Sequence, residues 1–474
     1  KFVYLAKKLR DEYTDYIYSL NKEFIKKKIF INKEISLFFF TEVSNKRTEI
    51  FDTYQAICHI ELIRNYLKKN KNINEIVLKK VQIEFSNCII KTFSGSYKIT
   101  DANIKKTHIP FFKILFKQAH FFLKTLFYLS FLKLYKSDFK VKGKIRKLFF
   151  TRYPKHFAPN GKDNKYGNFF GKKDIYLISI ISDGIHQNHS LYKLVKYYFK
   201  LKKIPYSTIL LDQFISYKQI VNSFFYSLRL FFLIKKISNN DFNFKKINIT
   251  SYIQSEYYLS MLRIPRLTVY EQSIKKISSK YKIDKIYFYL FEFSYGRYFN
   301  YLFKKYLTST TTIGFQHGPN SNRHLMFFLS KDEPSIGKDF NLQKLPIPDK
   351  IIAENNYSKR VYEEGNYKNI KIMSKIYRLS YLESIERKNI EKNSVLVAAA
   401  MHDGEQLFYH LLDEMIKNKI TNYYFKFHPK GKNSENLILK EKNDNIFEAT
   451  QDLNFYLSKV SKVIVTQSSV GYEA

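Results

Sequence analysis

The run DIYLISIIS at residues 174–182 decides the fold class, because it is a short, almost wholly apolar segment bounded by polar turns. Similar runs recur downstream with predicted helices between them: YSTILLD (206–212), KIYFYLF (285–291) and TTTIGFQ (310–316). Apolar runs of this length predict strands that are buried on both faces of a sheet. Because these strands alternate with helices, the sequence predicts an α/β protein with a parallel, doubly wound sheet.

A second set of alternating elements follows the proline-rich segment 319–349. The predicted strands of this set are KIIAE (350–354), IKIM (370–373), VLVAAA (395–400), YYFKFH (423–428) and KVIVTQ (462–467). Proline clusters between periodic segments indicate loops, so we take this segment as an inter-domain linker. The sequence therefore predicts two Rossmann-like domains with a cleft between them.

The first 150 residues follow a different pattern. The run EISLFFFT (34–41) predicts a buried strand, residues 49–69 a helix, and EIVLK (75–79) a second strand, which together suggest a β-α-β unit. The resulting division is an N-terminal α/β region (1–107), a basic helical segment (108–150), a first Rossmann-like domain (151–340) and a second one (341–474).

The segment 108–136 contains five lysines, no acidic residue, and many Phe and Leu. Lys113, Lys117, His120 and Lys124 recur at helical spacing and fall on one face of a helix, while the rest of the circumference is almost wholly apolar. One interpretation is an interfacial helix pair on an anionic membrane. The alternative is a buried helical hairpin whose lysines extend to the surface.

Composition excludes several classes of protein. The chain has 474 residues, 45% of them hydrophobic, which excludes a disordered chain. Its two cysteines exclude a disulfide scaffold and a Cys-based zinc finger. The net charge, 81 − 42 = +39, indicates attraction to nucleic acid, anionic lipid or phosphorylated substrates. Lys, Ile, Asn, Phe and Tyr share A/T-rich codons, however, so base composition accounts for part of the excess.

The ends and the hydropathy of the chain add three expectations. The chain begins at Lys1 and ends at Ala474, inside a predicted helix, so we expect a fragment of a longer protein. No run of about 18 uncharged apolar residues occurs, so the sequence predicts no ordinary transmembrane helix. We expect a cytoplasmic protein that is peripheral on the inner face of the cytoplasmic membrane.

Two candidate catalytic residues follow predicted strands of the first domain. His317, in Gly-Phe-Gln-His-Gly, lies on a turn at the edge of the sheet, where an imidazole can act as a base or donate to a phosphate. Glu292 follows the strand 285–291 and is a candidate general base. The alternatives are a turn histidine without a role and a glutamate favoured by a helix N-terminus.

The second domain offers candidate donor-binding residues at the ends of its predicted strands. His428 precedes a proline, which ends the strand and holds the imidazole at its tip, and Lys426 and Lys430 add positive charge. Gly404 begins a helix directly after the strand 395–400. Such a cluster suits a nucleotide phosphate, and the alternative is a basic strand end in a lysine-rich protein.

A third motif, Thr-Gln-Ser-Ser-Val-Gly-Tyr-Glu (466–473), joins a strand to a helix. Hydroxyls and free backbone N–H groups at a helix start form an anion site, which assigns Ser468 and Ser469 to a phosphate. Glu473 lies one turn further and is placed to accept from ribose hydroxyls. The alternative is an ordinary helix cap.

Together these motifs resemble bacterial glycosyltransferases of the GT-B type. The strand ending in His-Pro and the strand ending in Ser-Ser, with a Glu on the next helix, are similar to those of enzymes that use CMP-activated sugars, such as capsule Kdo transferases, sialyltransferases and polysialyltransferases. The Gly-Phe-Gln-His-Gly segment, the Glu292 strand and Leu345-Pro346-x-Pro348-Asp349 resemble the same surface carbohydrate biosynthesis proteins. The resemblance covers roughly residues 150–474.

The resemblance implies a GT-B fold and transfer of a sugar from a nucleotide-activated donor, CMP-linked by preference, to a glycan or lipid-linked acceptor in capsule-type polysaccharide biosynthesis. It implies that His428 contacts the donor phosphate or nucleotide, that Ser468 and Ser469 bind its phosphate, that Glu473 holds ribose, and that Glu292 or His317 is the base. It implies no metal in the site, and we expect no cofactor.

Three alternatives stay open. CDP-glycerol glycerophosphotransferases share the His-Gly, His-Pro and Ser-Ser segments, although the acidic residue expected before the serines is Gln467 here. A basic nucleic-acid-binding protein fits the charge and the aromatic content, but the basic residues are spread along the chain, so we expect no nucleic-acid partner. A catalytically inactive scaffold of GT-B shape is the third.

Overall fold

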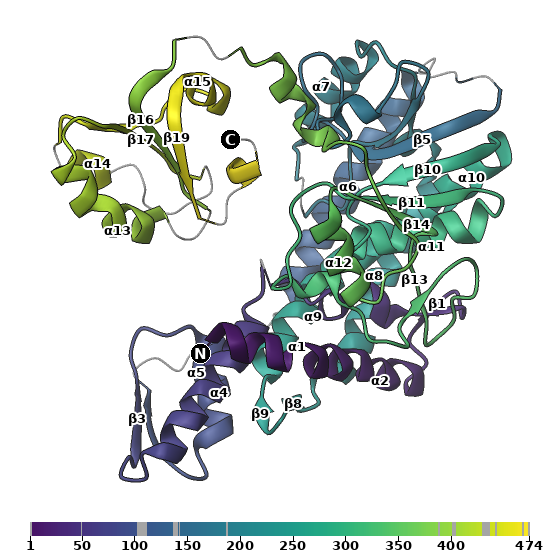
Figure 1. Ribbon diagram of the computed structural model, residues 1–474. Helices are drawn as coiled ribbons and strands as arrows, with labels where there is room; N and C mark the ends of the chain where they lie inside the picture. The colour runs from purple at the N-terminus through teal and green to yellow at the C-terminus, as the bar shows by residue number, and fades with distance from the viewer. Residues whose placement is uncertain are drawn as a thin grey trace. The chain divides into compact units, whose positions relative to one another are not determined.

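The protein is described here from a computed structural model (Figure 1). The structure describes residues 2–48, 50–101, 111–135, 141, 143–185, 188–386, 389–400, 404–428, 437–440, 443–466 and 469–472. The chain divides into two compact units.

The larger unit, Lys1–Lys165 with Phe170–Lys375, is built on a seven-stranded parallel sheet. Its spatial order is β15 (Ile370–Ile372), β14 (Lys350–Ala353), β11 (Thr311–Phe315), β10 (Ile283–Phe288), β5 (Ile145–Arg152), β6 (Ile175–Ser179) and β7 (Thr208–Leu210). Strand β6 is buried along its whole length, as expected for an apolar strand covered on both faces. The predicted α/β class with a parallel, Rossmann-like sheet is confirmed.

The order of the strands changes direction at the centre of this sheet. The chain starts at β5, continues outward through β6 and β7, and then returns to place β10 on the other side of β5, followed by β11, β14 and β15. This is the doubly wound order, in which ligands bind beyond the carboxyl ends of the strands at the switch point. The switch point here lies between β5 and β10.

Helices connect the strands of the larger unit (Figure 1). They are α7 (Leu191–Lys202), α8 (Tyr217–Ser238), α9 (Thr250–Thr268), α10 (Glu271–Lys280), α11 (Ser294–Tyr306) and α12 (Asn356–Glu364). The side chains of Ser190, Ser216 and Asn355 accept from the first turns of α7, α8 and α12, so these helices begin where the sequence supplies a cap.

The proline-rich segment is part of the larger unit, which corrects the predicted boundary at residue 341. Strand β14, predicted for the second domain, pairs with β11 in the first sheet, and β15, also predicted for the second domain, pairs with β14. Asp349 fixes this arrangement, because its carboxylate accepts from the Thr312 backbone N–H at 2.8 Å and from the Lys304 ammonium at 2.7 Å. Within the segment, β12 (Pro334–Ser335) and β13 (Leu345–Pro346) pair in parallel.

The N-terminal region belongs to the same unit and differs from the predicted β-α-β unit. Its elements are α1 (Phe2–Ser19), α2 (Asn21–Lys26), β1 (Phe30–Ile31), β2 (Ile35–Ser36), η1 (Leu37–Phe40), α3 (Glu42–Asn45), α4 (Thr53–Lys69), β3 (Glu75–Leu78), α5 (Ile83–Phe93) and β4 (Lys98–Asp101). The strand predicted at 34–41 is mostly the 3-10 turn η1, whose four side chains are all buried. The parallel pair is β3 with β4.

The basic segment predicted at 108–150 as a helix pair or a helical hairpin holds one helix and the start of a strand among its described residues. Within the described residues, α6 (Phe111–Leu134) occupies most of it, and β5 begins at Ile145. The basic residues before β5 continue the lysine-rich pattern, which concealed the start of the strand. No helix in the described ranges is long and apolar enough to cross a membrane.

The smaller unit, Tyr166–Phe169 with Ile376–Ala474, contains a four-stranded parallel sheet. Its spatial order is β18 (Ile446–Glu448), β17 (Asn422–Lys426), β16 (Glu391–Ala398) and β19 (Val460–Val465). Alternate residues of β16 point to opposite faces: Val395 and Val397 pack with α13 (Gly404–Lys417), and Leu396 packs with α15 (Leu453–Lys459). Helix α14 (Leu437–Lys440) lies between β17 and β18 in the sequence.

A short piece of earlier chain completes the smaller unit. The turn η2 (Gly167–Phe169) packs against η5 (Tyr377–Ser384), and the Phe169 and Tyr377 rings are 5.0 Å apart. A Cβ atom at Gly167 would lie 1.9 Å from the Tyr377 carbonyl oxygen, and the residue has a φ of +50°. Only glycine fits both conditions.

Glu256, on α9, is a buried carboxyl group that makes stability depend on pH. Burial raises its pKa from 4.5 to about 8; a hydrogen bond from Thr53 opposes this shift, and the Glu42 charge adds to it. The unfolded chain therefore releases this proton near pH 4.5, whereas the folded chain keeps it up to about pH 8. Because the folded state binds more protons over this interval, stability falls as pH rises through it.

We expect Glu256→Gln to stabilise the protein increasingly between these two pH values, since glutamine does not ionise. The gain in the free energy of unfolding should be on the order of 2–4 kcal/mol near pH 8 and close to zero near pH 4.5. Urea unfolding of both proteins at the two pH values measures it. An equal effect at both would contradict the assignment.

Candidate functional site

The candidate site of the larger unit lies at the carboxyl ends of β5, β10 and β11, beside the switch point. Arg152 is the last residue of β5, Tyr289 directly follows β10, and His317 follows β11 by two residues. Because the three strands are parallel neighbours, their ends meet at one edge of the sheet. Ligands of doubly wound folds bind at this edge.

A buried carboxyl group, Asp163, ties the strand ends together. It accepts from the Thr151 hydroxyl, from the Tyr289 hydroxyl at 3.1 Å, and from the Lys165 backbone N–H at 2.8 Å. Burial raises the pKa of Asp163 to about 6, against the hydrogen bond from Thr151. Because this pKa is still below 7, the carboxyl group is mostly ionised at neutral pH. Its hydrogen bond from the Lys165 backbone orders the loop that carries Lys165.

Two histidines flank Tyr289. The His156 ring stands 5.9 Å from the Tyr289 ring in a T-shaped contact, and the His317 ring lies 5.4 Å from it. The Lys165 ammonium donates to the His317 carbonyl at 3.1 Å. Burial lowers the pKa of His156 to about 3, and the Lys165 charge lowers it further. His156 is therefore neutral at physiological pH, so one ring nitrogen can accept a hydrogen bond.

Arg152 supplies the positive charge of this edge. Its side chain is 2% exposed, and its Nε and Nη1 atoms have no hydrogen-bond partner within the described part of the chain. The Tyr295 ring packs 5.0 Å from its Cζ atom. Buried polar groups are normally paired, so these unused donors indicate a site for an anion such as a phosphate or carboxylate.

The two predicted catalytic residues have different surroundings. His317 lies in the cluster with Tyr289 and Lys165, partly exposed. Glu292, at the start of the turn into α11, is 1% exposed and accepts from the Tyr362 hydroxyl of α12 at 2.9 Å. The role of Glu292 as a general base stays a prediction. Because its carboxylate is buried and bound by a tyrosine, it is less accessible to a substrate than the His317 ring.

Sequence reasoning missed Arg152, His156, Asp163 and Lys165. A signal was present, because the segment FFTRYPKHF (149–157) carries an apolar strand into Arg-Tyr-Pro and a histidine. Because the basic segment 108–150 includes the start of this strand, local pattern does not separate the strand from the helix before it, and its end is not recognised as a sheet edge.

The predicted residues of the smaller unit follow three adjacent strands. Gly404 begins α13 after β16, His428 lies two residues beyond β17, and Ser469 begins η6 (Ser469–Tyr472) beyond β19. Since β17 and β19 flank β16 in a parallel sheet, these positions share its carboxyl edge. Lys430, Ser468 and Glu473 lie outside the described residues.

Lys426 has structural partners. Its ammonium donates to the carbonyls of Ala449 at 3.2 Å and Gln451 at 2.7 Å, and it lies 5.7 Å from the centre of the Tyr456 ring. These contacts tie β17 to the loop that follows β18. They use two of the three ammonium donors, so a phosphate contact would have to come from the third.

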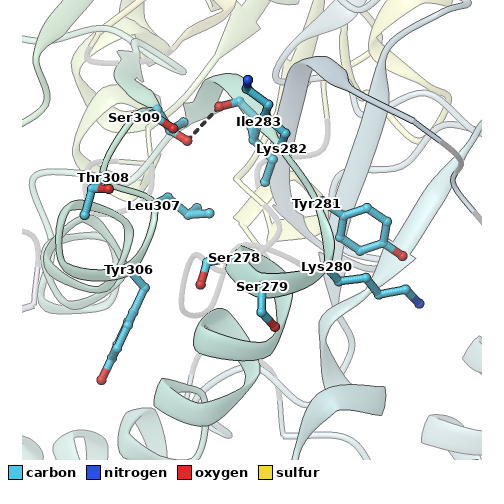
Figure 2. Close-up of a pocket in the computed structure, with 11 residues that line it drawn as sticks. Ser278, Ser279, Lys280, Tyr281, Lys282, Ile283, Tyr306, Leu307, Thr308 and Ser309 are labelled. Carbon is cyan, nitrogen blue, oxygen red and sulfur yellow. Dashed lines mark hydrogen bonds between the residues drawn. The ribbon is translucent and has the colours of Figure 1, made fainter.

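A cavity of about 380 Å³ lies at the opposite edge of the larger sheet (Figure 2). Its lining comes from residues 278–283 and 306–310, which precede β10 and β11, and Thr310 donates to the Ile283 carbonyl at 2.8 Å. The amino ends of parallel strands are not where such sheets bind ligands. We therefore place the candidate site at the carboxyl edge.

Across the described ranges, no group of three or more His, Cys, Asp or Glu side chains is placed to hold a metal ion. No family model matches the sequence, and no curated protein matches it.

Proposed function

We propose that this chain is a glycosyltransferase of the GT-B type, which transfers a sugar from a nucleotide-activated donor, CMP-linked by preference, to a glycan or lipid-linked acceptor. The observation that carries the proposal is the placement of Gly404, His428 and Ser469 after three adjacent parallel strands of the smaller unit. An edge of this kind, with a helix N-terminus beside a histidine, suits a nucleotide phosphate.

The larger unit supports the acceptor half of the proposal. In the reaction, the acceptor oxygen bonds to the anomeric carbon, the bond from that carbon to the donor phosphate breaks, and the nucleotide leaves with the electron pair. His317 takes the proton of the acceptor hydroxyl, and Arg152 binds an anionic group of the acceptor. The N-terminus of α13 and His428 stabilise the leaving phosphate.

The test is nucleotide-dependent thermal stabilisation of the protein by CMP, CDP, UDP and GDP. A nucleotide at about 100 times its dissociation constant should raise the free energy of unfolding by about 2.7 kcal/mol. We expect CMP to stabilise and His428→Ala to abolish the effect. The control is His410→Ala, an exposed histidine on α13 of the same unit, which should leave it unchanged.

Two other outcomes of the nucleotide experiment would favour different functions. A preference for CDP would favour a polyol-phosphate transferase of the CDP-glycerol type. No response to any nucleotide would reject the transferase proposal, and salt-sensitive binding to random oligonucleotides would then favour a nucleic-acid-binding protein.

A further inference from the structure

Three helices of the larger unit form one continuous surface. Helix α6 packs against both α7 and α8. The Phe111 and Phe231 rings are 4.7 Å apart across the α6–α8 contact, and the Phe131 and Phe199 rings are 5.8 Å apart across the α6–α7 contact. We call the outer surface of α6, α7 and α8 the three-helix face.

Large apolar side chains project from this face into solvent. On α6, Phe112 is 77% exposed and Phe116 is 74% exposed. At about 100° per residue, the exposed apolar residues of α6 fall within a sector of about 60°. They are Phe112, Phe116, Leu123, Phe127 and Leu134. The other exposed apolar residues of the face are Leu191, Tyr192 and Phe199 on α7 and Tyr217, Val221, Phe225 and Phe232 on α8.

The charge of the three-helix face has one sign. Helices α6, α7 and α8 each contain four Lys or Arg residues, and none of the three contains Asp or Glu. Lys113, Lys117 and His120 are exposed directly beside the apolar sector of α6. An exposed surface in contact with water alone normally mixes both signs and keeps apolar patches small.

We propose that the three-helix face docks the protein on the surface of an anionic lipid bilayer. The exposed rings would enter the boundary between headgroups and acyl chains, and the surrounding lysines would contact lipid phosphates. An anionic bilayer is the occupant that matches both properties, because it offers apolar depth to the rings and negative charge to a face that lacks acids. The proposal does not rest on the transferase activity.

A cavity beside the apolar sector adds a place for a headgroup. It has a volume of about 260 Å³ and is lined in part by Phe116, Lys117, His120 and Arg266. Arg266 is buried and held by the Gln118 side chain at 2.8 Å. The basic side chains of this lining suit a lipid phosphate at the depth of the exposed rings.

The test is co-sedimentation of the protein with vesicles of phosphatidylcholine alone and with vesicles in which about a third of the lipid is phosphatidylglycerol. We expect binding only to the anionic vesicles. The variant Lys113→Glu/Lys196→Glu should weaken it about tenfold or more, because each lysine near such a surface contributes about fivefold. The control Lys68→Glu/Lys69→Glu makes the same charge change on α4, where both lysines are exposed, and should bind as the unmodified protein does.

A second pair of variants tests the apolar contribution. Phe116→Ser/Phe127→Ser should weaken binding to anionic vesicles about tenfold or more, whereas Tyr66→Ser, at an exposed tyrosine of α4, should not. Equal weakening by both lysine pairs would overturn the proposal, because attraction would then follow net charge alone. It would also be overturned if vesicles did not bind and the phenylalanine variant instead converted a dimer to monomers in light scattering, or abolished oligonucleotide binding.

Discussion

Replacing Arg263 with leucine is expected to lower the free energy of unfolding by about 3–5 kcal/mol. The Arg263 guanidinium on α9 is fully buried between the carboxylates of Glu42 and Asp183, which are equally buried, and its Nε donates to Asp183 at 3.0 Å. Leucine would leave two buried carboxylates without their cation. Breaking a buried pair on one side is far more costly than losing an exposed one, because the remaining charge has no compensation.

Urea unfolding measures this effect. The matched control is Lys144→Ala, which removes an ion pair to Asp284 at 2.9 Å in which both side chains are exposed, and it should cost less than about 1 kcal/mol. Adding Glu42→Gln to Arg263→Leu should recover part of the loss, since it removes one uncompensated charge. A loss within about 1 kcal/mol for Arg263→Leu alone would show that the buried triad contributes little.

The second large effect concerns Arg152. Because its Nε and Nη1 donors have no partner among the described residues and its side chain is buried, we expect phosphate to bind it and to raise the midpoint of thermal unfolding. Arg152→Met should weaken phosphate binding about 10- to 100-fold, the usual contribution of hydrogen bonds to a charged group. If the edge catalyses transfer, the rate should fall about 100-fold as well.

The measurement is the unfolding midpoint in sodium phosphate and in sodium chloride of equal ionic strength. Arg146→Met on the same strand, where the side chain is exposed, should keep the full response to phosphate. Without phosphate, Arg152→Met should be at least as stable as the unmodified protein, since it removes a buried charge. A variant that is destabilised like Arg263→Leu and still responds to phosphate would make Arg152 a structural residue.

The elements that can be predicted from local sequence are those with a clear hydrophobic pattern. The runs at 174–182 and 310–316 became β6 and β11 because an apolar strand covered on both faces leaves a continuous hydrophobic signal. His317 was found for the same reason, since a turn residue after such a strand must lie at the sheet edge. The start of β5 is not predicted, and Arg152 at its end is therefore missed. The reason is that both the helix before β5 and the first residues of β5 are rich in basic residues, so no change of pattern marks the boundary.

Other features depend on contacts between distant parts of the chain. Glu42 and Arg263 are 221 residues apart, and neither has a neighbour in sequence that reveals the ion pair. The assignment of β14 to the first sheet depends on Asp349 binding Thr312 and Lys304, although prolines before it resemble a linker. Local sequence reports propensity, whereas such pairings follow from how the finished sheet brings strands together.

The turn η2 has a consequence for limited proteolysis and for domain excision. Since residues 166–169 belong to the smaller unit while the chain on both sides belongs to the larger one, the polypeptide passes between the units three times. A single cut near residue 375 therefore gives a C-terminal fragment that lacks residues 166–169, the segment that packs against Tyr377. During synthesis, residues 166–169 leave the ribosome more than 200 residues before their partners, so the smaller unit is completed only when the C-terminal part of the chain has emerged.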